Sequence, residues 1–247
     1  METAMRKSEL IARLRSEILS LQGFRTPSLG QHSDFGLGPV EAAFPNGVFP
    51  IGAIHEFISS ATEESAATSG FMAALAGRLM KEDGICLWIG TRRSVFPLAL
   101  HFFGAAPERV IFVDVKKERD LLWMIEEGLK CEALAAVIGE IKEISLTGSR
   151  RLQLAVEQSK VTGLLHRVNP RLNNPVASVC RWQISPIPSQ LDTGLPGVGF
   201  ARWNVQIVKV RNGEPGSWQL EWSNGRFTPI TRPVIKRVGK RQILRAV

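Results

Sequence analysis

From residue 52 onward, short apolar runs alternate with amphipathic segments, and this alternation restricts the possible folds more than any other feature. The runs ICLWIG, VIFVDV and AAVIGEI have the length and composition of buried strands. Between them lie segments such as RDLLWMIEEGLK, whose apolar residues recur at helical spacing. Strands joined through helices form parallel sheets that are covered on both faces. The sequence therefore predicts an α/β fold, with a mostly parallel sheet flanked by helices.

The same patterns place strands at residues 53–58, 85–90, 110–115, 135–141 and 177–184, and helices at 70–81, 96–104, 119–130 and 149–167. A polar loop, SSATEESAATS, separates the first strand from the first of these helices. After a loop rich in Pro and Gly, Ile184 to Ala201, two alternating runs at 202–211 and 217–223 are joined by NGEPG. Alternation across a Gly-containing turn predicts a C-terminal antiparallel hairpin at the edge of the sheet.

The chain is expected to have three parts. Residues 1–38 contain an amphipathic helix, Ser8 to Gln22, and a linker; residues 39–230 form the core; residues 231–247 form a basic tail that is expected to be disordered. The net charge is +8, but six cations lie in the tail, and the rest of the chain has 25 basic residues against 23 acidic ones. The charge therefore does not make the core a nucleic-acid binder. The charged N-terminus and the lack of a long apolar run predict a cytoplasmic protein.

The element order resembles the core of the RecA recombinase family over about residues 39–222. FPIGAIHEF resembles the turn and first strand that lead into the phosphate loop of that family, and Gln183 stands near a strand end where the family keeps a Gln. Within this superfamily, three stretches resemble the ImuA family, the RecA-like members of bacterial DNA-damage mutagenesis cassettes: LGPVEAAFPNGVFPIGAIHEF, GEIKEISLTGSRRLQLAVEQSKVTG and ARWNVQIVKVRNGEPGSWQLEW. The resemblance implies a role in SOS-induced translesion synthesis, with an ImuB-like inactive polymerase relative and an error-prone C-family polymerase as partners.

A phosphate-binding loop needs glycines, a Lys for the phosphates and a Ser or Thr for magnesium. No Lys or Arg occurs between Arg25 and Arg78, and two carboxylates stand in the loop. We therefore interpret the segment as a degenerate phosphate loop with residues Ser59, Ser60, Glu63, Glu64, Ser65, Thr68, Ser69 and Gly70. Weak nucleotide binding, with Mg²⁺ bridging a carboxylate to phosphate, is the alternative.

The catalytic acid of the family is also missing. After the strand at residues 85–89, where RecA-like ATPases keep a Glu, this chain has Gly-Thr-Arg-Arg, and neither Arg92 nor Arg93 can act as a general base. Glu140 replaces the usual metal-binding Asp, either as a metal ligand or as an acid at a strand end. Glu140 and Gln183 are interpreted as vestigial. We expect no enzymatic activity, no cofactor and no metal; the alternative is an active ATPase or recombinase.

Partner binding is expected at the two ends of the chain. Leu14 and Ile18 lie on the apolar stripe of the N-terminal helix, which suits a protein partner or a recombinase. The tail offers six cations and an apolar pair: Arg232, Lys236, Arg237, Lys240, Arg241, Arg245, Ile243 and Leu244. These suit a protein partner, DNA or simple solubility, and a sequence-independent DNA-binding protein is a further alternative.

Other basic and aromatic residues receive structural interpretations. His166 and Arg167, at the end of the helix expected over 149–167, are assigned to a solvated face. The loop from Ile184 to Ala201 lacks Lys and Arg and is poorly suited to DNA. Three Trp on the hairpin are expected to cover the sheet edge, with base stacking as the alternative; they are Trp203, Trp218 and Trp222.

Overall fold

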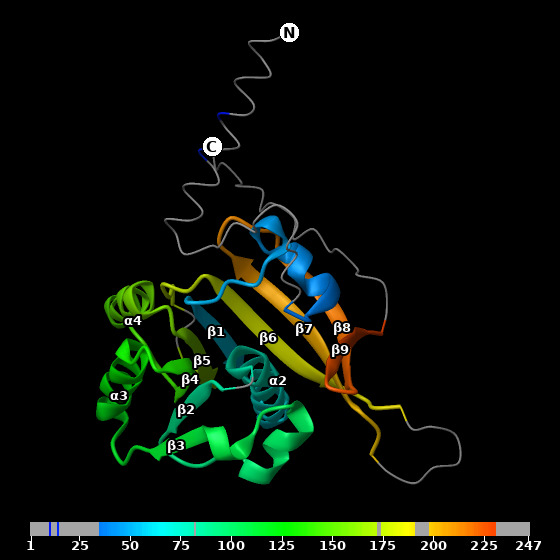
Figure 1. The fold of residues 1–247 in the computed structure, drawn as a ribbon, viewed down its shortest axis with the longest axis horizontal. Helices are drawn as coiled ribbons and strands as arrows, with labels where there is room; N and C mark the ends of the chain where they lie inside the picture. The colour runs from blue at the N-terminus through cyan, green and yellow to red at the C-terminus, as the bar shows by residue number, and fades with distance from the viewer. Residues whose placement is uncertain are drawn as a thin grey trace, which may run out of the picture.

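The computed structural model describes residues 35–81, 83–171, 174–190 and 198–230, together with Leu10 and Leu14. Within these residues one sheet has the strand order β3-β2-β4-β5-β1-β6-β7-β8-β9 (Figure 1). Its parallel part comprises β1 Ile54–Ser59, β2 Ile85–Gly90, β3 Val110–Asp114, β4 Leu134–Ile141, β5 Thr162–Val168 and β6 Cys180–Ile187. Its antiparallel part adds β7 Ala201–Val210, β8 Gly216–Ser223 and β9 Arg226–Pro229. The expected α/β class, with a mostly parallel sheet and a C-terminal antiparallel hairpin, is confirmed.

Helices cover both faces of the sheet. They are α2 Thr62–Met80, α3 Glu118–Lys130 and α4 Leu146–Ser159, with 3-10 segments η1 Gly38–Ala43, η2 Pro45–Gly47, η3 Pro97–Phe103 and η4 Pro107–Arg109. In β4, Ala136 and Ile138 pack in the cluster that contains α2, whereas Val137 and Ile141 pack in the cluster that contains α3 and α4. Adjacent strand residues point to opposite faces, so α2 lies on one face and α3 with α4 on the other (Figure 1). None of the described helices is long and apolar enough to cross a lipid bilayer.

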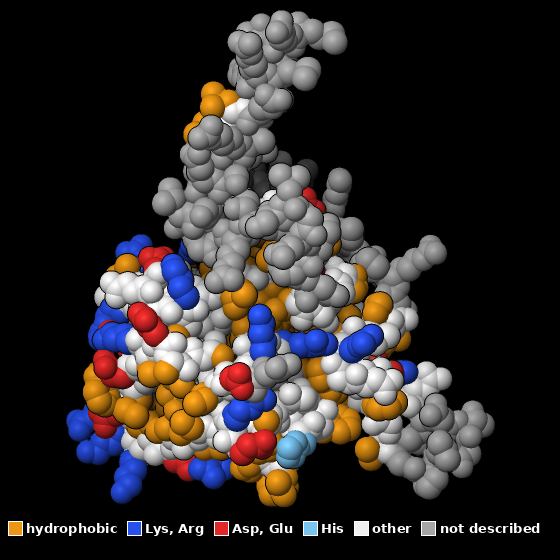
Figure 2. Space-filling model, viewed as in Figure 1, with side chains coloured by type: hydrophobic (Ala, Val, Ile, Leu, Met, Phe, Trp, Pro, Cys, Tyr) orange, Lys and Arg blue, Asp and Glu red, His pale blue; other side chains and the backbone are white. Residues whose placement is uncertain are grey.

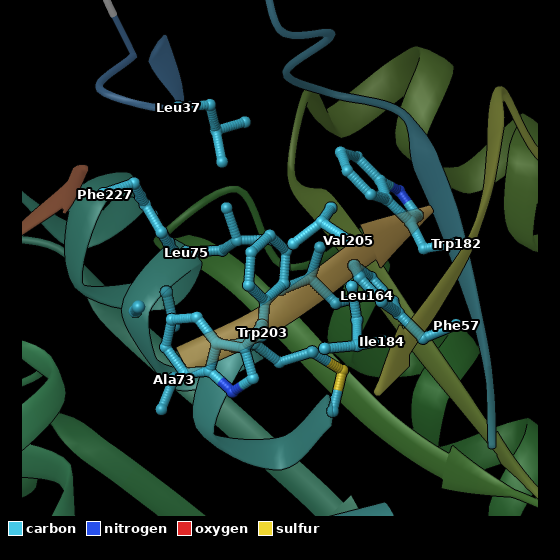
Figure 3. Packing of buried hydrophobic residues seen from close by; sticks show 14 of the residues in the cluster. Leu37, Phe57, Ala73, Leu75, Leu164, Trp182, Ile184, Trp203, Val205 and Phe227 are labelled. Carbon is cyan, nitrogen blue, oxygen red and sulfur yellow. The ribbon is translucent and has the colours of Figure 1, made fainter. Parts of the chain in front are cut away.

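The larger core lies between α2 and the sheet, and every strand contributes residues to it (Figure 3). Trp182 of β6 is fully buried and stacks on Phe57 of β1, with 5.6 Å between ring centroids. Trp203 meets Phe71 of α2 edge to face, with 5.5 Å between centroids. The tryptophans expected to cover the sheet are indeed buried, with exposed fractions of 2%, 7% and 3% for Trp203, Trp218 and Trp222. Their rings are therefore part of the core and are not accessible for base stacking.

Two of the expected boundaries are wrong. The polar loop expected over residues 59–69 is mostly helix, because α2 begins at Thr62. The helix expected over 149–167 ends at Ser159, and Thr162–Val168 forms β5 in the middle of the sheet. Lys160 causes this break by taking a left-handed conformation, with φ of 63°. His166 and Arg167, assigned to a solvated face, are consequently 0% exposed.

The segment after β6 also differs from expectation. β6 continues to Ile187, so part of the loop expected from Ile184 to Ala201 is strand. Gln183 therefore lies in the middle of β6, paired with Gln206 of β7, and its side chain is exposed. The hairpin of β6 and β7 extends beyond the rest of the sheet (Figure 1).

Candidate functional site

A cavity of about 1000 Å³ opens where several parallel strands end. It is lined by residues that follow β1, β2, β4 and β5, by the start of α2 and by η3. In open α/β sheets, ligands bind outside the carboxyl ends of the strands, so this is the expected position for a functional site. The residues expected in the degenerate phosphate loop that line it are Ser60, Ser65, Ser69 and Gly70.

The connection between β1 and α2 is very short. β1 ends at Ser59 and α2 begins at Thr62, so only Ser60 and Ala61 lie between them. A loop that wraps around phosphates needs several more residues, including glycines. The backbone N–H of Ser60 donates a hydrogen bond to the Glu64 carboxylate at 2.7 Å. A side chain of the protein itself therefore occupies a donor beside the start of the helix, and Glu63 lies exposed in the same first turn.

The hydroxyls behind this connection are buried in a small polar cluster. Ser59 Oγ lies 2.9 Å from Thr68 Oγ1 and 2.9 Å from His166 Nε2. All three side chains are 0% exposed, and burial lowers the pKa of His166 from 6.5 to about 4. The cluster joins β1, α2 and β5. Because Ser59 and Thr68 face the core, neither can supply a magnesium-binding hydroxyl in the cavity.

Glu140, at the carboxyl end of β4, lines the cavity but already has two hydrogen-bond donors. Trp88 Nε1 donates to its Oε1 at 2.8 Å, and Ser94 Oγ donates to the same oxygen at 2.6 Å. These bonds hold the carboxylate against the end of β2. Sequence patterns could not identify either partner, because Trp88 belongs to an ordinary apolar strand and Ser94 to a loop.

The cations of the cavity lie beyond the ends of β2 and β4. Arg93 pairs with Asp114 at 3.0 Å and lies over the Phe112 ring, 5.0 Å from its centroid. Arg92 and Lys142 also line the cavity, and neither makes an ion pair or hydrogen bond with any residue that the structure describes. Lys142 was not identified from the sequence, since a single Lys after a strand is an unremarkable surface residue. The cavity thus combines two cations that have no partner among the described residues with the carboxylates of Glu118 and Glu140.

The wall of the cavity formed by the η3 segment is apolar. Val95, Ala99, Leu100 and Phe103, in and next to η3, line the cavity. The other large side chains of the same segment face outward, with exposed fractions of 67% for Phe96, 64% for Leu98 and 53% for Phe102. The indole of Trp222 fixes the segment by donating to the Phe102 carbonyl at 2.7 Å.

The remaining sequence-predicted residues do not join this site. Gln183 does not line the cavity, because it projects from the middle of β6. Leu14 is helical and 47% exposed, and Leu10, one turn earlier, is 56% exposed. Ile18 and all of the predicted tail residues lie outside the described part of the chain.

Comparison with known proteins assigns the chain to a family through its sequence. No protein-family model matches the chain. Among solved structures, SulA from Pseudomonas aeruginosa aligns with 18% identity and a TM-score of 0.40, covering 47% of this chain and 97% of SulA. Protein ImuA from Caulobacter vibrioides, in strains NA1000 / CB15N and ATCC 19089 / CIP 103742 / CB 15, is 33% identical over 211 residues. That alignment covers 81% of this chain and 86% of the relative, and the chain therefore belongs to the ImuA family.

Proposed function

We propose that this protein is a non-catalytic, RecA-like accessory protein of SOS-induced translesion synthesis, a mutagenic form of DNA repair. It acts by binding an ImuB-like polymerase relative, together with an error-prone C-family polymerase. Membership of the ImuA family supports the repair context. The main support for a non-catalytic role is the two-residue connection between β1 and α2, in which Glu64 accepts a hydrogen bond from the Ser60 backbone.

Nucleotide binding is opposed by both geometry and charge. The short connection supplies no curled backbone for phosphates. Glu63 and Glu64 would each repel a triphosphate by about 1 kcal/mol across 4 Å of water-like dielectric. The N-terminal dipole of α2 offers only about 0.3 to 1 kcal/mol in return at an exposed site. Arg92 and Lys142 lie across the cavity, so they offset this repulsion without replacing the Lys that a phosphate loop carries.

Hydrolysis is opposed by the positions of the acids. A general base must reach the attacking water, but Glu140 accepts hydrogen bonds from Trp88 and Ser94. The residues after β2 are Thr91, Arg92 and Arg93, which include no acid. An active ATPase is therefore the weaker candidate.

Co-purification tests the proposal directly. The full-length protein is expressed with each neighbouring product of its cassette, and complexes are measured by size-exclusion chromatography with light scattering. A stable complex with the ImuB-like product, formed equally well without nucleotide, is the expected result. A complex that requires ATP, or no complex with any cassette product, contradicts the proposal.

A sequence-independent DNA-binding protein is the second candidate, favoured by the six cations of residues 231–247. The described core favours it less. On the face seen in Figure 2, Lys and Arg side chains are interspersed with Asp and Glu, and hydrophobic side chains lie between them. A DNA-binding face needs a row of cations that matches the phosphates.

A further inference from the structure

We propose that the cavity and the η3 segment together bind a protein segment that presents a carboxylate beside large apolar side chains. Phe96, Leu98 and Phe102, called the η3 ridge below, are exposed on one side of this segment, and its other side lines the cavity. The inference depends on the proposed function in one respect: we take the bound segment to belong to the cassette partner.

The η3 ridge is a fixed surface rather than a loose loop. Trp222 holds it through the Phe102 carbonyl, and Phe103 packs against Trp203 with 6.0 Å between ring centroids. Within seven consecutive residues, three large apolar side chains are each more than half exposed. Their contact with water is unfavourable unless a partner covers them. Hydrophobic side chains also reach the surface at the lower edge of the face in Figure 2.

The charges of the cavity select the partner. Arg92 follows β2 and Lys142 follows β4, and these strands are neighbours in the sheet, so both cations lie at the same end of it. Neither cation has an acid partner among the described residues, whereas the neighbouring Arg93 is paired with Asp114. Unpaired cations beside an apolar surface complement a segment that combines acidic and large apolar side chains.

The two ends of this chain do not supply that segment. Residues 231–247 carry six cations and no acid, so Arg92 and Lys142 would repel them. Residues 1–34 carry five cations and four acids, which gives no acidic excess. A different protein is therefore the better occupant.

Nucleic acid is also a poorer occupant, although it is anionic. The carboxylates of Glu118 and Glu140 line the cavity, and Glu63 and Glu64 lie in the first turn of α2. A polyanion would meet all four, whereas a peptide can direct one carboxylate to Arg92 or Lys142 and keep apolar side chains elsewhere.

Two double variants of the full-length protein test the inference. Phe96→Ala with Leu98→Ala truncates the two most exposed side chains of the η3 ridge, and Arg92→Glu with Lys142→Glu reverses the charge of the two cations. Matched controls on α4 are Leu154→Ala, at a side chain that is 61% exposed, and Arg150→Glu, at an exposed cation. All four variants change exposed or half-buried side chains, and circular dichroism checks that they fold.

The first readout is affinity for the purified ImuB-like product, measured by biolayer interferometry across a salt series. Each double variant is expected to weaken binding about tenfold or more, and the charge reversal also reduces the salt dependence. The controls should stay within about twofold. If the wild-type protein binds and both double variants bind equally well, the inference is wrong while the proposed function stands.

The second readout needs no natural partner, so it decides the inference even if the ImuB-like product does not bind. Fluorescence anisotropy compares a labelled peptide that carries one Glu beside Leu and Phe residues with the same peptide carrying Lys in place of that Glu, and with a short single-stranded oligonucleotide. The acidic peptide is expected to bind at least tenfold more tightly than the basic peptide, and to lose affinity in both double variants. Equal binding of the two peptides, or tighter oligonucleotide binding that both double variants abolish, overturns the inference.

Discussion

The backbone N–H of Ser60 donates to the Glu64 carboxylate, with 2.7 Å between the nitrogen and Oε2. The protein thus fills with its own anion a donor that a phosphate oxygen would otherwise use. In addition, Ala61 at the N-cap of α2 has no side chain that could cap the helix. The start of α2 is therefore the place to test nucleotide binding.

We expect no binding of Mg-ATP by calorimetry at physiological nucleotide concentration. The double variant Glu63→Gln with Glu64→Gln removes the repulsion but not the shortness of the connection, so it should not bind either. Micromolar affinity in that variant would mean that charge alone blocks the site. Micromolar affinity in the wild-type protein, or hydrolysis that Glu140→Gln abolishes, contradicts the non-catalytic proposal.

A second prediction concerns the buried acid of β1. Glu56 is 0% exposed and accepts from Arg167 Nη1 at 2.9 Å and from Arg181 Nε at 2.6 Å. Glu56→Gln removes the buried one of the two carboxylates that pair with the fully buried guanidinium of Arg167; the other, Glu143, lies 3.3 Å from it and is partly exposed. The free energy of unfolding in urea should fall by about 3 to 5 kcal/mol. Glu127→Gln, at an exposed acid paired with Lys130, should cost less than about 1 kcal/mol. Similar losses of stability for both variants would mean that the buried ion pair contributes no more to stability than the exposed one.

Acid should destabilise the fold through two histidines. Burial lowers the pKa of His55 from 6.5 to about 4, against a smaller opposing effect of its hydrogen bond to the Pro50 carbonyl, and burial lowers that of His166 to about 4. Between about pH 4 and pH 6.5 each histidine is protonated in the unfolded chain but neutral in the folded one. The free energy of unfolding therefore falls as pH falls through this range. The contribution is full above about pH 6.5 and is lost progressively towards pH 4, by up to about 3 kcal/mol per histidine.

His166→Gln isolates one of the two groups, because the amide can still meet Ser59 while no longer titrating in this range. Denaturation curves at several pH values should show a smaller loss of stability between pH 6.5 and 4.5 in the variant than in the wild type. An unchanged pH dependence would assign the acid sensitivity to groups other than His166.

The fold class and most strands could be predicted because short apolar runs indicate buried strands. The start of α2 could not, since its first two turns are hydroxyl- and acid-rich, and Thr68 and Ser69 become buried only through packing of the whole helix. The strand Thr162–Val168 was missed because its apolar run continues the helical pattern of α4, and the turn is made by Lys160, a residue that rarely adopts positive φ.

The site was predictable only in part, for a similar reason. Residues near the expected phosphate loop were located because a family pattern gave their positions. The sequence marks Arg92 only as a residue that cannot act as a base, and it gives no signal for Lys142. Their common position depends on β2 and β4 being neighbours, which the order of strands along the sequence does not reveal.

The N-terminal stripe provides a further prediction. Leu10 and Leu14 are helical, with exposed fractions of 56% and 47%, so neither side chain is buried in the core. Leu14→Asp with Ile18→Asp should leave the thermal unfolding of the core unchanged and weaken self-association or partner binding. Analytical ultracentrifugation and partner capture measure the two effects. If the double variant unfolds, the stripe is part of the core instead.

The tail gives the last prediction, and it separates two partners. Against DNA, its six cations would release counterions, so affinity would fall steeply with salt and depend little on sequence. Against a protein, Ile243 and Leu244 would anchor the tail, and the cations would mainly raise the association rate. We favour a protein partner, because an Ile-Leu pair adds nothing to counterion release.

Deleting residues 231–247 and truncating both apolar side chains, Ile243→Ala with Leu244→Ala, give different patterns for these partners. If the tail docks on a protein, both variants lose capture of the ImuB-like product, and the truncation leaves DNA affinity unchanged across a salt series. If the tail binds DNA, only the deletion matters, and it reduces the slope of affinity against salt by nearly one for each phosphate contact removed. Capture that neither variant changes rules out the docking role, because the truncation removes the only large apolar anchor at that end of the tail.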